Sequence, residues 1–144
     1  MIIFILLIAS SLAQTLSIKT PCSQQLLWSQ ALSELPKNLA TATLATLEAS
    51  GLQYLGTEQG ITQINHSPLG LAAIEIISAT EMYSYGWCYQ INGMIPEVYP
   101  HEIELNSDDQ VVWFYGFAHY QNGEWISQCE DSILRSQEKF CQNP

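Results

Sequence analysis

The sequence contains little positive charge. Four Lys and Arg residues stand against fourteen Asp and Glu residues in a chain of 144, and the formal net charge is −10. A surface of this sign repels phosphate backbones and anionic lipid headgroups. The composition therefore argues against nucleic acid and membrane surfaces as partners, and leaves a protein or a small molecule.

The sequence also lacks the short motifs of the common catalytic and metal sites. It has no G-x-S-x-G nucleophile elbow, no glycine loop for phosphate and no C-x-x-C pair for zinc. The three histidines lie far apart, and a metal site would need two or three of them to converge with a carboxylate such as Glu102. We therefore predict a protein that is not an enzyme and that needs no cofactor or metal.

No apolar run reaches the roughly 20 residues of a transmembrane helix. Met1–Ile8 is an unbroken apolar run followed by small residues, which is typical of a signal peptide with cleavage after Ala13. A buried N-terminal strand is the alternative. The predicted location is periplasmic or secreted, and the predicted divisions are a signal at 1–13, an N-terminal strand or extension at 14–39, a domain at 40–129 and a tail at 130–144.

Four cysteines follow this presumed signal, namely Cys22, Cys88, Cys129 and Cys141. An even count in a small exported domain indicates two disulfides, for which three pairings are possible. We favour Cys88 with Cys129 and Cys22 with Cys141, because the first pair would tie a hairpin near Gly86 to the strand end after Trp125.

Local patterns predict one helix and several strands. Thr41–Ser50 has helical apolar spacing, and Gly51 follows where a left-handed cap is wanted. Two segments, Gln25–Leu35 and Leu71–Ser78, fit either a strand or a helix. Short alternating strands are predicted at 15–20, 52–55, 60–64, 87–91, 103–105 and 111–115.

Turn residues punctuate the second half of the chain. Asn92-Gly93 and Asn122-Gly123 suit type I′ hairpin turns, and Asn106–Asp109 forms another turn cluster. Adjacent residues in a strand point to opposite faces, so Asp108 and Asp109 are predicted to serve the turn and not a shared substrate.

Aromatic residues concentrate in the same part of the chain. Alternation places Trp87 with Tyr89 on one face, and Trp113 with Tyr115 on one face. We predict that Trp87 and Trp113 belong to the core. The hydroxyls of three tyrosines need water or a partner, which makes these residues the candidates for a ligand-binding surface: Tyr99, Tyr115 and Tyr120.

Two segments carry a family resemblance, Tyr85–Gly93 and Ile103–Tyr115. Together they resemble the W-x-Y-x-V-N-G … L-x-x-G-D-x-V-x-W-x-Y pattern of the transcobalamin C-terminal-like family of exported domains, with Asp108 in place of the family's glycine. The resemblance covers about residues 40–129. It implies an α+β fold, a β-grasp-like mixed sheet of about five short strands with the helix Thr41–Ser50 packed across it.

The resemblance further implies a binding or surface module. In the animal cobalamin carriers such a domain closes over one side of the corrinoid, but this sequence has no counterpart of the large helical domain that forms the other side. We therefore expect an exported, non-catalytic binding or interaction module. The alternatives are a site for a small planar, corrinoid-like ligand, a small hydrolase that uses His101 or His119 with a carboxylate, and a structural subunit.

Overall fold

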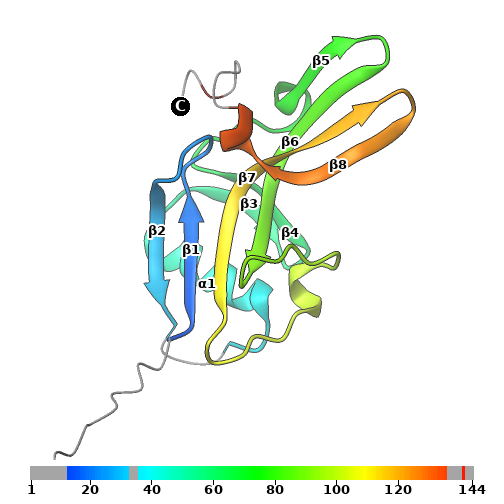
Figure 1. The fold of residues 1–144 in the computed structure, drawn as a ribbon. Coiled ribbons are helices and arrows are strands. Elements are labelled where there is room, and N and C mark those ends of the chain that lie inside the picture. Colours follow the sequence, from blue (N-terminus) through cyan, green and yellow to red (C-terminus); the bar gives the residue numbers. More distant parts are fainter. Residues whose placement is uncertain (1–12, 33–35, 136–140, 142–144) are drawn as a thin grey trace, which may run out of the picture.

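The structure is a computed structural model that describes residues 13–32, 36–135 and 141. The signal predicted at 1–13 lies almost wholly outside the described residues. Among those residues, no helix is long and apolar enough to cross a membrane. They form one α-helix, eight strands and three short 3-10 helices (Figure 1). The helix is α1 (Leu39–Ser50), and the strands are β1 (Thr15–Lys19), β2 (Leu26–Ala31), β3 (Tyr54–Thr57), β4 (Gly60–Ile64), β5 (Ile74–Ser78), β6 (Glu81–Ile91), β7 (Gln110–Gln121) and β8 (Glu124–Asp131).

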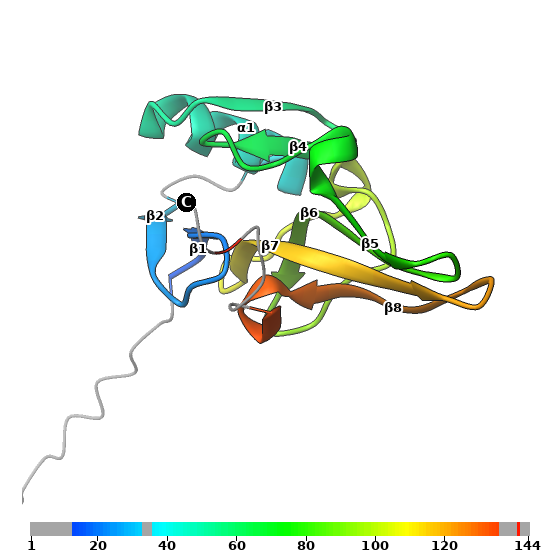
Figure 2. The same ribbon diagram turned by 90° about the horizontal axis from the view of Figure 1, so that it is seen from above.

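Six of these strands make one mixed sheet. Its order is β2-β1-β7-β6-β5, with β8 also paired to β7. The central pair, β1 and β7, is parallel, and the other pairs are antiparallel. In Figure 2, α1 and the separate β3–β4 hairpin lie as a second layer over this sheet. A parallel central pair with an antiparallel neighbour on each side and one helix across them is the β-grasp-like arrangement that was predicted, and the α+β class is confirmed.

Helix α1 begins two residues before the predicted start and ends at the predicted residue. Asn38 caps its N-terminus, where Oδ1 accepts a hydrogen bond of 2.9 Å from the backbone N–H of Thr41. Gly51 ends the helix with a φ of 71°, which glycine adopts at little cost. Leu39 and Leu47 are fully buried against the sheet.

The eight strands exceed the number of about five that the family resemblance implies, and two of them are long. β6 and β7 pair without interruption from Glu81↔Gln121 to Ile91↔Val111. Because the alternation of aromatic and smaller residues continues along both strands, one face carries a ladder of cross-strand aromatic pairs. From the inner end outward these are Tyr89–Trp113, Trp87–Tyr115, Tyr85–Phe117 and Tyr83–His119, with ring centroids 5.0, 5.6, 5.9 and 4.4 Å apart.

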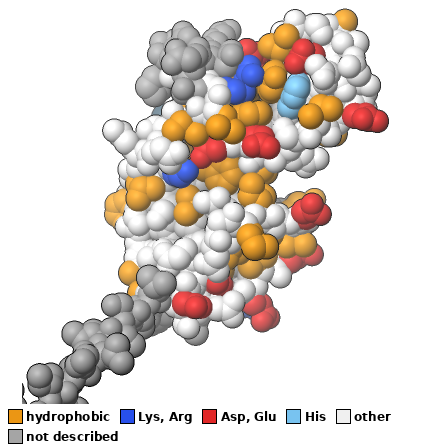
Figure 3. Space-filling view, viewed as in Figure 1, with side chains coloured by type: hydrophobic (Ala, Val, Ile, Leu, Met, Phe, Trp, Pro, Cys, Tyr) orange, Lys and Arg blue, Asp and Glu red, His pale blue; other side chains and the backbone are white. Residues whose placement is uncertain are grey.

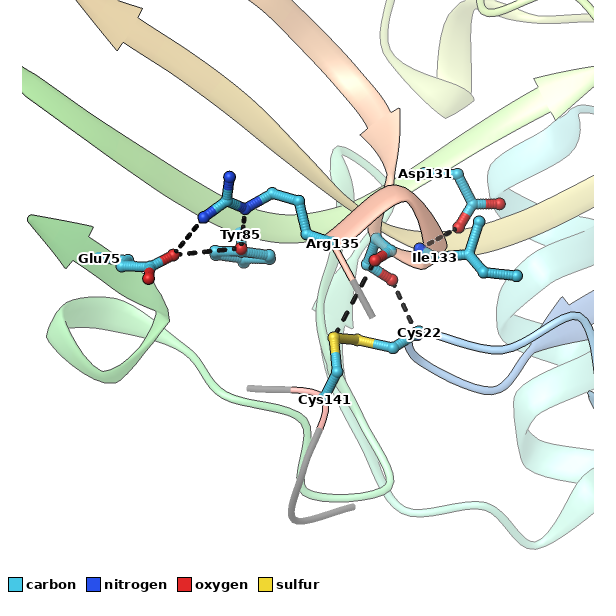
Figure 4. Close-up of a disulfide and its surroundings, with 8 residues drawn as sticks. Cys22, Glu75, Tyr85, Asp131, Ile133, Arg135 and Cys141 are labelled. Carbon is cyan, nitrogen blue, oxygen red and sulfur yellow. Dashed lines mark hydrogen bonds and ion pairs between the residues drawn. A yellow bond between two sulfur atoms is a disulfide. The ribbon is translucent and has the colours of Figure 1, made fainter. Parts of the chain in front are cut away.

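The outer part of this ribbon projects as two hairpins, β5–β6 and β7–β8 (Figure 1). A cluster of side chains covers its ladder there. Arg135 places its guanidinium 3.6 Å from the centroid of the Tyr83 ring, and it also contacts Glu75 at 3.0 Å and the Tyr85 hydroxyl at 2.8 Å. Figure 4 shows the Arg135 side chain pointing toward Glu75 and Tyr85. The backbone of Arg135 lies close to the Cys22–Cys141 disulfide in the same view.

The disulfides join Cys22 to Cys141 and Cys88 to Cys129, the two pairs favoured from the sequence. The second bridge links β6 to β8 across the intervening β7. It passes beside Gly116, where a Cβ atom would lie 3.2 Å from the Cys88 sulfur and 2.8 Å from the carbonyl oxygen of Glu130. A residue without a side chain is therefore needed at that point.

Two strand predictions are wrong in detail. Ile103–Leu105 is not a strand, because these residues follow the 3-10 helix Pro100–Glu102 and pack toward α1, where the Ile103 carbonyl accepts a hydrogen bond from the N–H of Leu39. Asn92 and Gly93 do turn with φ values of 52° and 82°, but only the single bridge Ile91↔Met94 follows. Two segments fitted either a strand or a helix. Gln25–Leu35 contains β2, and Leu71–Ser78 contains part of a 3-10 helix and then β5.

The turn prediction for the paired aspartates holds. Asp109 is 6% exposed, and its carboxylate accepts hydrogen bonds from the Asn92 side chain at 2.8 Å and from the backbone N–H of Asn106 at 2.7 Å. The Asp109 side chain thus joins the turn after β6 to the turn before β7, and so holds the two ends of the intervening loop together.

Candidate binding groove

Strand β6 has an unpaired outer edge. β5 pairs with it only between Glu81 and Ser84, and the bridge from Ile91 to Met94 occupies its far end. Between these points, in the described part of the chain, the segment 86–90 pairs with β7 on one side and with no strand on the other. The 3-10 helix Gly70–Ala73 turns the chain away before β5 begins, which leaves this length of edge uncovered.

A groove of about 1090 Å³ runs along this edge, and we call it the edge groove. One wall is the loop Ile95–Pro100, the opposite wall is the β8 segment Trp125–Cys129, and the floor contains Trp87 and Tyr89. Figure 3 shows the molecule hollowed on its right-hand side, between the projecting hairpins and the chain below them.

A smaller hollow of about 430 Å³ adjoins the edge groove, and we call it the side hollow. The two share Ile61 and Trp87 in their linings. The side hollow also contains Tyr85 and Gly86, so together the two hollows follow β6 from Tyr85 to Tyr89.

The floor of the edge groove is held rigidly from the core side. The Trp87 indole N–H donates to Ser67 Oγ at 2.8 Å, and the Trp113 N–H donates to Thr43 Oγ1 at 2.9 Å. The Tyr89 hydroxyl donates to the carbonyl oxygen of Val98, which ties the loop wall to the floor. Since these polar atoms have partners already, the floor offers a ligand mainly ring surface.

The charged side chains that line the edge groove are acidic. Glu97 and Glu102 line it, and no Lys, Arg or His does so among the described residues. Glu102 accepts a hydrogen bond of 2.8 Å from the N–H of Tyr99. Burial, and then the nearby charge of Glu102, raises the pKa of Tyr89 above its usual value. The groove therefore favours a ligand with positive charge.

The three tyrosines predicted to bind a ligand do not converge. Tyr99 is 60% exposed on the rim of the edge groove. Tyr120 is half-buried on the outer hairpin, where its ring lies 5.2 Å from that of Trp125 in an edge-to-face contact. Only Tyr99 lines the groove, and Tyr120 supports one of its wall residues.

The prediction of an exposed surface for Tyr115 is wrong. This side chain is 1% exposed, and its hydroxyl donates to the carbonyl oxygen of Pro68 at 2.8 Å. Burial, and then the neighbouring Tyr85, raises its pKa well above the usual value. Trp87 and Trp113, by contrast, belong to the core as predicted.

Sequence reasoning missed most of the groove walls. Their exposed apolar side chains are Ile95, Val98, Trp125 and Ile126. The available signal was the segment Ile95–Pro100, which combines two prolines with apolar residues and follows a turn, and so has no regular structure in which to bury them.

None of the three histidines is among the residues that line the two hollows. His66 and His101 are exposed, and His101 stacks on Tyr99 with ring centroids 5.9 Å apart. His119 lies 3.0 Å from Glu81 and stacks on Tyr83 in the outer ladder. The described residues contain no group of three His, Cys, Asp or Glu side chains that could hold a metal ion.

Comparison with known proteins identifies a family to which this chain is similar. A family model described as "Domain of unknown function (DUF4430)" matches residues 42–116, which run from α1 to the middle of β7. The matched segment includes the floor of the edge groove and its loop wall, whereas the β8 wall lies beyond it. Searches of curated proteins and of solved structures gave no match.

Proposed function

The chain belongs to the DUF4430 family, and on this basis we propose that it is an exported, non-catalytic binding domain whose edge groove holds the partner. The segment shared with the family contributes the groove floor and the loop Ile95–Pro100. The link to transcobalamin-like domains, inferred from the Trp87 and Trp113 segments, is part of this proposal.

One observation carries the proposal, namely the exposed apolar surface of the groove walls. Tyr99 is 60% exposed, Ile126 56%, Val98 49%, Trp125 48% and Ile95 45%. Exposed apolar side chains that line one groove, together with acidic residues, are typical of an interaction site. The groove volume of about 1090 Å³ lies slightly above the range of about 300–1,000 Å³ that is usual for ligand pockets in proteins.

Export is supported by two features. The run Met1–Ile8 has the character of a signal peptide, and the two disulfides are of a kind that persists in oxidising compartments. A periplasmic or secreted protein is the location that we propose.

A small planar, corrinoid-like ligand is the second candidate. The size of the groove and its aromatic floor favour it, as does the resemblance to the cobalamin carriers. The hydrolase alternative has less support, because His119 and its partner Glu81 line neither hollow.

A pair of matched variants tests the proposal. Ile126→Glu places a charge on the groove wall, while Ile76→Glu makes the same change on β5, where the side chain is 75% exposed and outside the groove. The immobilised protein would be incubated with extract and culture medium from the cells that produce it. Bound proteins and small molecules would then be identified by mass spectrometry. Cobinamide would be added separately and followed by its visible absorbance.

We expect any true partner to be lost from Ile126→Glu by at least about tenfold and to be retained by Ile76→Glu. If both variants reduce capture of a partner equally, or if neither reduces it, the edge groove is not the binding site. If the wild type retains cobinamide and only Ile126→Glu loses it, the result would support a corrinoid-like ligand in the edge groove.

A further inference from the structure

We propose that the edge groove binds an extended segment of another protein, which adds to the sheet as a strand beside β6. This inference rests on the proposed function and names the partner class for the same site. The segment would carry alternating apolar side chains and at least one Lys or Arg.

The backbone of β6 supplies the first argument. Ile91 directs both its N–H and its C=O away from β7, since it exchanges hydrogen bonds of 2.8 and 3.0 Å with Met94. Along an antiparallel strand these groups alternate in direction, so Trp87 and Tyr89 present theirs to the same outer side. The hydrogen bonds found in the described residues give these outward groups no partner.

Open space along the edge is the second argument. The edge groove and the side hollow meet at Trp87 and together follow the strand from Tyr85 to Tyr89. In Figure 1 this inner stretch of β6 has β7 on one side, and on the other side lies the loop that follows β6 and forms one groove wall. An added strand would continue the line of β5, which stops at Ile74.

Side chains on both sides of the edge supply the third argument. Residues of an added strand would point alternately to opposite faces. One set would meet the loop wall at Val98 and Tyr99, and the other would meet β8 at Trp125 and Ile126, all of which are exposed apolar side chains. Edge pairing with pockets for alternate side chains is a known mode of peptide recognition.

Charge decides between the sources of such a strand. A second copy of this chain would bring another formal charge of −10 to a groove that Glu97 and Glu102 already make acidic. Two copies therefore repel each other at this edge, whereas a cationic segment is attracted. The partner is accordingly a segment of a different protein.

The probe for the test is a phage library of random peptides about twelve residues long, selected on the disulfide-bonded protein. The peptide that binds best would be synthesised and N-methylated at one backbone position at a time. We expect affinity to fall by roughly tenfold at every second position, where an N–H faces β6, and to change little at the positions between. Loss at consecutive positions, or at none, would overturn strand addition.

Charge variants give a second readout. Glu97→Lys should weaken the selected peptide by roughly fivefold to tenfold, while Glu104→Lys, an exposed change outside the groove, should leave its affinity unchanged. Equal weakening by both variants would contradict a cationic segment in this groove.

The outcomes separate this inference from the proposed function. A peptide that is lost in Ile126→Glu but shows no alternation on N-methylation leaves the groove function standing and refutes strand addition. Failure to enrich any peptide refutes the inference, and capture of a small molecule through Ile126 would still support the function. If sedimentation shows a dimer that Ile126→Glu dissociates, the edge binds a second copy of this chain, and the inference of a different protein as partner is refuted.

Discussion

The β6–β7 ribbon has two halves that follow the same alternation but end in different surroundings. In the inner half, the ladder pairs Tyr89–Trp113 and Trp87–Tyr115 are buried beneath α1, β4 and the turn after β4. In the outer half, Tyr83–His119 lies beyond the helix and is covered by Arg135.

This difference shows that alternation determines which side chains share a face, but not what covers that face. The inner pairs are shielded from water by other apolar groups, and their polar atoms make hydrogen bonds to partners such as Thr43 and Pro68. The outer pair is covered by a cation, which stacks on Tyr83 and is itself neutralised by Glu75. The two halves should therefore differ in how much each residue contributes to stability.

The largest expected difference concerns matched ladder positions on β7. Trp113→Ala removes a 1% exposed side chain and leaves Thr43 Oγ1 without its donor, so we expect the free energy of unfolding to fall by about 3–5 kcal/mol. His119→Ala, in the outer half, should cost about 1 kcal/mol or less. Urea unfolding followed by circular dichroism measures both, and similar losses would contradict the distinction between the halves.

The boundary between the halves can be tested at two glycines that face each other in register, Gly86 and Gly116. A methyl group at Gly116 would approach the Glu130 carbonyl to 2.8 Å, so Gly116→Ala should cost about 1–3 kcal/mol. At Gly86 the same methyl group meets nothing within 4 Å, and Gly86→Ala should be neutral or slightly stabilising. Thermal unfolding of the two variants measures the loss of stability. A larger loss for Gly86→Ala than for Gly116→Ala would contradict close packing at Gly116 and open space at Gly86.

In the outer half, Arg135→Met keeps an unbranched side chain but removes the charge. We expect a loss of about 1–2 kcal/mol, since the variant gives up the cation–π contact with Tyr83 and the ion pair with Glu75. Hydrogen exchange should quicken in β5 and the outer part of β6, while the inner ladder stays protected. Lys37→Met, at an exposed position, serves as the control, and uniform loss of protection throughout the sheet would count against two separate halves.

The smallest effect is a response to alkaline pH that arises in the inner half. The pKa values of Tyr115 and Tyr89 are raised in the folded protein, chiefly by burial. The unfolded tyrosines lose their protons from about pH 10, so stability is retained below that pH and falls as the pH rises above it.

Tyr115→Phe tests this response. The variant should lose about 0.5–1.5 kcal/mol at neutral pH, because the hydrogen bond to the Pro68 carbonyl is gone, and its stability should fall less steeply above about pH 10. Melting temperatures taken at intervals from about pH 8 to 11 would reveal the change in slope. An unchanged slope would mean that Tyr115 is not buried in its neutral form.

Much of the fold was predictable because it depends on local signals. Asn122-Gly123 does form the β7–β8 hairpin, with both residues at positive φ, and Gly51 ends the helix. The length of β6 and β7 was underestimated, because Tyr83 and His119 were not recognised as a continuation of the ladder. Ile103–Leu105 was assigned to a strand because a short apolar alternation does not distinguish pairing with a strand from packing against a helix.

The candidate site was much less predictable. Tyr115 looked like a binding residue because its hydroxyl needs a partner, but that partner is a carbonyl 47 residues away in sequence. The groove brings together the loop Ile95–Pro100, the unpaired edge of β6 and the far strand β8. An unpaired edge is a property of topology, and nothing in the residues of β6 marks it.

The Cys22–Cys141 bridge has a mechanical consequence. It closes a covalent ring around nearly every element, but β1 (Thr15–Lys19) lies before Cys22 and so outside the ring. Tension between chain segments beyond the two cysteines passes through the sulfur atoms and leaves the enclosed strands unloaded. The force would instead act on β1, which is held between β2 and β7 with Leu16 and Ile18 fully buried. Strand β1, one member of the parallel central pair, is thus the part that yields first when the protein is pulled.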